Sequence, residues 1–142
     1  MKRPLLFVVA SIALGLAVTS GHTAEPNEVA PFMRLKLTHS EKLLEGIALA
    51  DFAMIEKYSQ ALSIQSRDEM WQILQTPDYL QHSIDFRRAA DRVTAAARKK
   101  NIDAAALAYV GLTLQCVECH KHVRDVRRAD VDLQAPLRVG QR

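Results

Sequence analysis

The chain has 142 residues, of which 49% are hydrophobic and 25% charged, and its formal net charge at pH 7 is +3. This length and composition predict one globular domain with a single core. Two of the positive charges, on Lys2 and Arg3, lie at the very start of the chain, so the remainder is close to neutral. We therefore do not expect the protein to bind nucleic acid, because the chain beyond Lys2 and Arg3 is not strongly basic.

The N-terminal segment has the pattern of a secretory signal. Lys2 and Arg3 precede an uncharged, largely apolar run over residues 4–20, and small and polar residues follow as far as Ala24. This pattern is typical of a signal peptide that is removed after export. A retained membrane anchor is the alternative, although the apolar run is near the lower limit for crossing a bilayer. We predict that residues 1–24 are cleaved and that the mature protein is periplasmic.

The rest of the sequence predicts an all-α fold. No alternating β pattern is evident, glycines are few, and the prolines lie near expected helix boundaries. The predicted helices span residues 31–45, 52–64, 77–100 and 104–128. Short connections between long helices favour antiparallel neighbours, so we predict an up-down-up-down four-helix bundle over residues 25–128. Residues 129–142 are predicted to form a flexible C-terminal tail.

Polar residues and a glycine mark the predicted helix boundaries. Asp51 and Thr76 are the predicted N-caps of the second and third helices, and Asp103 is the predicted N-cap of the fourth. Gly46 is suited to end the first helix, because glycine is common just past helix ends. These boundaries leave short connections and a longer one between the second and third helices.

Apolar residues at intervals of three and four predict which helix faces turn inward. On the first helix the predicted face contains Met33, Leu37, Ser40, Leu44 and Ile47. On the fourth helix it contains Ala105, Ala108, Leu112, Cys116, Cys119, His120 and Val123. Both cysteines and His120 are therefore expected to point into the bundle.

The only two cysteines of the chain lie in the sequence CVECH, residues 116–120. The spacing C-x-x-C-H is that of a covalent attachment site for c-type haem. Cys116 and Cys119 lie one helical turn apart, which suits two thioether bonds to the haem vinyl groups. His120 then follows as the proximal axial ligand of the iron. One covalently bound haem c, with its iron, is thus the predicted cofactor.

Three other uses of these residues fit the sequence less well. A disulfide between residues i and i+3 of a helix has awkward geometry and closes a very short loop. A thiol–disulfide exchanger places its C-x-x-C at a helix N-terminus after a strand, whereas this pair lies near a helix C-terminus. A zinc site that adds His122 to Cys116, Cys119 and His120 would require a break in the helix, because His122 points away from His120.

The sequence CVECHKHVR contains Cys116, Cys119, His120 and the basic Arg124 near the C-terminus of a helical chain of this length. In this it resembles the class II c-type cytochromes, the cytochrome c′ family. The resemblance covers about residues 28–128 and implies a four-helix bundle with one haem near the end of the last helix. Members of this family either bind small gas ligands at a five-coordinate iron or carry electrons with methionine as the sixth ligand.

An antiparallel bundle brings the end of the last helix beside the starts of the first and third helices. Met33 and Phe86 are then expected near the haem, with Met33 as the sixth iron ligand. A core methionine that only packs on the porphyrin is the alternative. His82 is a second alternative for the distal residue. Leu37 would shield an open sixth position if Met33 points elsewhere.

The basic residues around the motif suggest roles at the haem edge. Arg124, one turn beyond His120, is expected to pair with a haem propionate or to restrain the proximal imidazole. Lys121, Arg127 and Arg128 add positive charge that would steer an acidic redox partner protein. The sequence thus predicts a single-electron carrier, not an enzyme. A five-coordinate haem module that binds nitric oxide or another diatomic gas is the alternative. The sequence allows a homodimer with either function.

Overall fold

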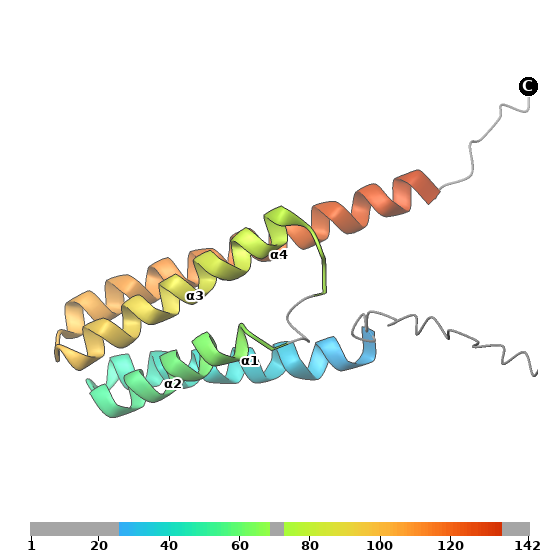
Figure 1. Cartoon of the computed structure of the whole chain (residues 1–142). Coiled ribbons are helices and arrows are strands. Elements are labelled where there is room, and N and C mark those ends of the chain that lie inside the picture. Colours follow the sequence, from blue (N-terminus) through green and yellow to red (C-terminus); the bar gives the residue numbers. More distant parts are fainter. Residues whose placement is uncertain (1–25, 69–72, 135–142) are drawn as a thin grey trace, which may run out of the picture.

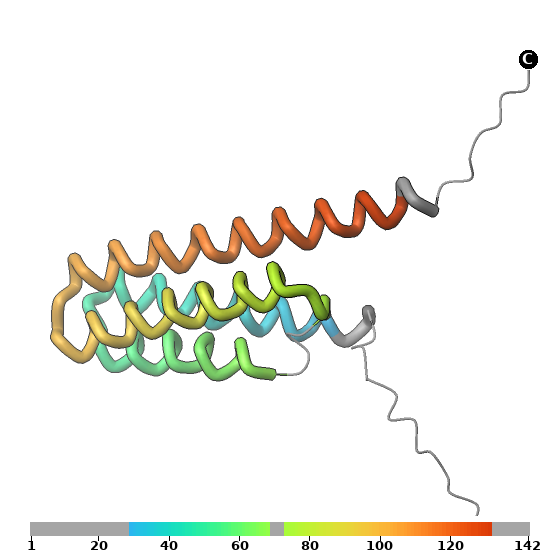
Figure 2. Tube along the Cα trace, turned by 45° about the horizontal axis from the view of Figure 1, so that its top comes forward, coloured from blue at the N-terminus to red at the C-terminus, as the bar shows by residue number. Residues whose placement is uncertain are grey.

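The computed structural model describes residues 26–68 and 73–134. Within these residues the chain forms α1 (Pro26–Ala48), α2 (Phe52–Gln65), α3 (Pro77–Arg98) and α4 (Ile102–Gln134). Consecutive helices run in opposite directions and pack side by side in chain order (Figure 1, Figure 2). The predicted all-α fold with four successively packed helices is therefore confirmed.

Polar side chains at the connections set where the helices begin. Asp51 and Thr76 each accept a hydrogen bond from the backbone amide three residues further on, at 3.0 and 3.3 Å. These two predicted N-caps are confirmed. The predicted cap of α4 is wrong, because Asn101, and not Asp103, accepts the equivalent bond at 2.9 Å. Asparagine and aspartate cap helices about equally well, so local preference did not separate the two positions.

The first helix is longer than predicted at both ends. It runs from Pro26 to Ala48 and passes through Gly46, whereas the predicted span was residues 31–45. Gly46 is buried against α2, where even an added Cβ would be crowded. The residue therefore permits close packing of α1 on α2 and does not end the helix. The chain turns instead at Ala50, whose φ is 52°.

The last helix also extends beyond its predicted end. It continues to Gln134 instead of stopping at residue 128, and its end projects past the rest of the bundle (Figure 1). The predicted C-terminal tail therefore begins as helix. Residues 135–142, like the signal peptide predicted at residues 1–24, lie outside the described residues. By length and apolar composition Ile102–Val131 could cross a membrane, but in the structure this stretch packs on α3 as a member of the bundle.

Apolar side chains from all four helices form the core. The largest fully buried ones are Leu43, Ile55, Leu62, Tyr79, Phe86, Val93 and Leu112. Burial of each such side chain contributes about 1.5–3 kcal/mol relative to its exposure. Ser59 of α2 and Thr94 of α3 are buried in the same core, and their hydroxyl oxygens lie 2.7 Å apart. Each hydroxyl also lies within hydrogen-bonding distance of a backbone carbonyl of its own helix, so both buried polar groups have partners.

The inward face of α1 differs from the predicted one. Phe32, Lys36 and Leu43 are buried, whereas Leu37 and Leu44 are about half exposed. Neighbouring residues on a helix differ in direction by about 100°, so the true core face lies one residue back from the predicted one. The prediction missed this face because it was based on the spacing of apolar residues, and one residue of the true core face is a lysine.

The helices α1 and α4 touch each other far less than the other neighbouring helices do. One link between them is the hydroxyl pair of Ser40 and Tyr109, whose oxygens lie 3.2 Å apart. The Tyr109 hydroxyl also donates to the Ser40 carbonyl oxygen at 3.3 Å. Toward the start of α1 and the end of α4, the two helices diverge around a slot.

Candidate functional site

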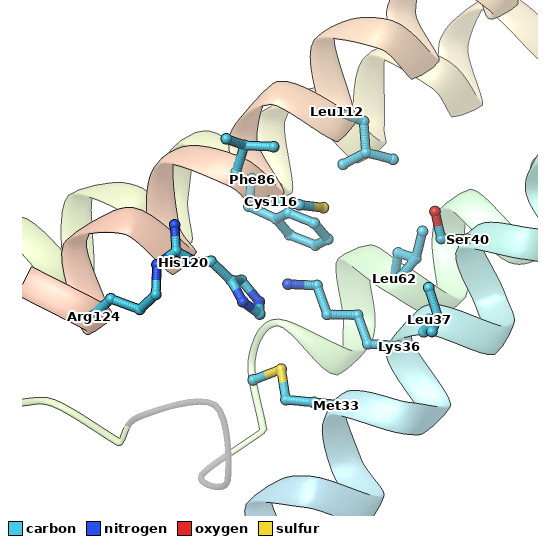
Figure 3. A pocket seen from close by; sticks show the side chains of 11 residues that line it. Met33, Lys36, Leu37, Ser40, Leu62, Phe86, Leu112, Cys116, His120 and Arg124 are labelled. Carbon is cyan, nitrogen blue, oxygen red and sulfur yellow. The ribbon is translucent and has the colours of Figure 1, made fainter.

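A slot of about 460 Å³ lies between α1 and α4 (Figure 3). From α1 it is lined by Met33, Lys36, Leu37 and Ser40. From α4 it is lined by Leu112, Cys116, Val117, His120 and Arg124. Leu62 of α2 and Phe86 of α3 form its inner wall. Its volume is within the range of pockets that hold cofactors and other small ligands, about 300–1,000 Å³.

A smaller cavity of about 280 Å³ adjoins the slot. The two cavities share four lining residues, which are Met33, Lys36, His120 and Arg124. Cys116 lines the slot, Cys119 lines the smaller cavity, and His120 lines both. The one-turn spacing of the motif therefore places both cysteines and His120 along the same side of α4. Cys119 is buried and Cys116 is partly buried, whereas His120 is exposed at the cavities, although it was expected to point into the bundle.

All six residues that sequence analysis selected line one or both cavities: Met33, Phe86, Cys116, Cys119, His120 and Arg124. Leu37 lines the slot beside them. His82 is not part of the slot lining, and its ring centroid lies 5.1 Å from that of His122. His82 thus packs against a histidine of α4 and lines neither of the two cavities.

Lys36 was not among the site residues predicted from the sequence. Its side chain is only 6% exposed, and its Nζ lies 4.3 Å from the centre of the Phe86 ring. The amine points from α1 toward His120 and Phe86 (Figure 3). A desolvated cation over an aromatic ring is attracted by about 2 kcal/mol. Lysine is usually found on an exposed helix face. The only feature of the sequence that pointed to Lys36 as a slot residue was its position three residues after Met33.

Burial and charge shift the pKa values of the basic groups in the slot. Burial lowers the pKa of Lys36, and the two cysteines oppose this shift in part. The pKa of His120 lies below its ordinary value of 6.5, first because of partial burial and then because of the positive charges of Lys36 and Arg124. His120 is therefore mostly a neutral imidazole at pH 7, which is the form that binds a metal.

The cysteine thiols are shifted in the opposite direction. Burial raises the pKa of Cys116 and of Cys119, and the charge of Lys36 offsets only part of that rise. A thiol that exchanges disulfides needs a lowered pKa, so this environment does not suit exchange chemistry. Both cysteines are free thiols.

The charged groups around the two cavities are basic. Among the described residues that line them, Lys36, Arg124 and Arg127 have basic side chains, and none carries a carboxylate. The inner walls are apolar. A site of this kind fits an apolar molecule that carries anionic groups, because the walls match its apolar part and the cations match its charges.

No protein family model, no curated protein and no solved structure matches the chain. The fold and the site together define a four-helix bundle that presents a C-x-x-C-H sequence to an apolar slot with basic groups around it.

Proposed function

We propose that the protein is an exported monohaem c-type cytochrome that carries single electrons. The observation that supports this most is that the C-x-x-C-H residues line two adjoining cavities with apolar walls and basic groups. Cys116 and Cys119 would hold a haem by two thioether bonds, and His120 would bind its iron. The bound haem would supply an iron that cycles between two oxidation states.

The side chains around the slot would shield and orient this group. Leu62, Phe86 and Leu112 are each about 1% exposed and exclude water from the inner wall. A site shielded from water favours a higher reduction potential than an exposed one, because the more charged oxidised state is less well solvated. Arg124 is exposed at the slot, where its guanidinium would pair with a haem propionate.

Met33 is the proposed sixth ligand of the iron. It lines the slot from α1, while His120 lines it from α4 (Figure 3). A thioether ligand raises the reduction potential and completes the coordination of the iron, which suits electron transfer. Leu37 lines the same slot. If Met33 only packs in the wall, Leu37 would shield a five-coordinate iron, and binding of nitric oxide or another diatomic gas is then the second candidate function.

The end of α4 would meet a redox partner. Arg124 and Arg127 line the cavities there, whereas Lys121 and Arg128 lie 3.2 and 4.0 Å from acidic residues one turn earlier on the same helix. These pairs reduce the net positive charge, so steering of an acidic partner would be modest and would weaken with added salt. Export to the periplasm, predicted from residues 1–24, belongs to the same proposal.

Expression of the full chain in a host that matures c-type cytochromes tests the proposal. We expect a coloured protein whose mass exceeds that of the processed chain by one haem. The matched control is the double variant Cys116→Ser with Cys119→Ser, which should lack covalent haem. A colourless wild-type protein with the mass of the bare processed chain would refute the proposal.

The visible and electron paramagnetic resonance spectra of the haem-containing protein test the sixth ligand. We expect low-spin ferric iron with the charge-transfer band of a bound thioether, and loss of that band in Met33→Ala. A thioether band that persists in Met33→Ala would exclude Met33 as the ligand. A high-spin wild-type spectrum that changes when nitric oxide is added would favour the gas-binding function.

A further inference from the structure

Lys36 lies within the proposed haem site but has no part in the function proposed so far. Its side chain is 6% exposed, and its Nζ lies 4.3 Å from the centre of the Phe86 ring. Its charge acts on Cys116, Cys119 and His120, the three residues of the haem motif. The amine is therefore close to the residues that would hold the haem and its iron (Figure 3).

The position of Lys36 on α1 places it beside Met33. Side chains of residues that are three apart project from the same side of a helix, about one turn from each other. Met33 and Lys36 accordingly line both cavities together with His120. The helix α1 thus brings two donors, a thioether and an amine, to a slot whose other side carries the proximal histidine.

A buried lysine amine is a suitable nitrogen donor. Lys36 is 6% exposed and its Nζ lies over the Phe86 ring in the wall of the slot, so the amine is already held inside the site. The neutral amine has a lone pair and is a harder donor than a thioether. It therefore suits ferric iron better than ferrous iron.

We propose that Lys36 is a second distal donor whose amine takes the sixth position of ferric haem iron when the Met33 thioether leaves it. This inference rests on the proposed haem function. In the exchange the iron–sulfur bond breaks, an iron–nitrogen bond forms and the ammonium proton passes to water. No electron is transferred in this step.

Four haem-containing proteins test the inference: the wild type, Met33→Ala, Lys36→Arg and the double variant Met33→Ala with Lys36→Arg. Arginine keeps the positive charge and the length of lysine, but its guanidinium does not lose a proton and so does not bind iron. The charge and the donor role of Lys36 are thereby separated. If Lys36→Arg does not fold or does not take up haem, the uncharged Lys36→Gln replaces it in the same comparison.

The readouts are the ferric visible and electron paramagnetic resonance spectra. We expect Met33→Ala to lose the thioether band but remain low-spin with nitrogen ligands on both sides, and the double variant to become high-spin.

Three outcomes would overturn the inference while leaving the haem proposal intact. These are a high-spin Met33→Ala protein, a high-spin wild type, and a double variant that stays low-spin because another residue binds the iron. A wild-type protein without covalent haem would instead overturn the proposed function itself, and this inference with it. The two failures are therefore distinguished by the presence of haem.

Discussion

Gly46 and Gly111 form a matched pair for testing how α1 packs on α2. Both lie inside helices, but a Cβ added at Gly46 would lie 3.1 Å from Met54 Cγ and 3.2 Å from both the Cγ1 and the backbone nitrogen of Ile55. At Gly111 an added Cβ would have no such neighbour within 4 Å. The Ile55 nitrogen belongs to the first turn of α2 and cannot yield unless that helix moves.

The two substitutions to alanine should change stability in opposite directions. Alanine is favoured over glycine inside a helix by about 0.8–1 kcal/mol. Nothing opposes this gain at Gly111, so Gly111→Ala should raise the free energy of unfolding by about 1 kcal/mol. Overpacking costs about 1–3 kcal/mol, so Gly46→Ala should lower that free energy by about 1 kcal/mol. The variants should then differ by about 2 kcal/mol, which corresponds to about 8 °C in melting temperature.

Thermal and urea unfolding, followed by the helical circular dichroism signal in one fixed redox state, measure this difference. Gly46→Ala should melt below the wild type, and Gly111→Ala should melt above it. Equal stability of the two variants would refute the argument that α2 packs directly on Gly46.

Three further predictions concern the site and the core. Replacing Cys116 and Cys119 by serine should lower the melting temperature strongly, because the haem proposed to fill the slot would no longer be attached; native-like melting of this variant would contradict the expectation. In the same variant, studied at low temperature, the NMR titration of His120 should have its midpoint below 6.5. Because the pKa of His120 is lower in the folded than in the unfolded state, the neutral imidazole contributes to the free energy of unfolding. This contribution is present above pH 6.5 and is lost as the pH falls through the folded-state pKa. A midpoint above 6.5 would reverse the sign of this pH dependence. Ser59→Ala leaves the Thr94 hydroxyl with only its 3.3 Å bond to a backbone carbonyl and should cost about 1 kcal/mol. An unchanged urea midpoint would show that the hydroxyl pair contributes nothing.

Features that depend on a few neighbouring residues could be predicted from the sequence. The caps at Asp51 and Thr76 involve amides only three residues away, and helix periodicity sufficed for the all-α class and the order of the helices. The spacing of Cys116, Cys119 and His120 likewise determined that they share one side of α4, because the geometry of a single helix is known in advance.

Features that depend on a second helix were decided by the tertiary structure. Gly46 has the local signal of a helix end, yet α2 packs against it and α1 continues past it. Lys36 has the local signal of an exposed residue, yet its long side chain turns into the slot and meets Phe86 of α3. In both cases the sequence states what a residue prefers in isolation, whereas the neighbour that changes this preference comes from a distant part of the chain. Only the packed bundle brings the two together.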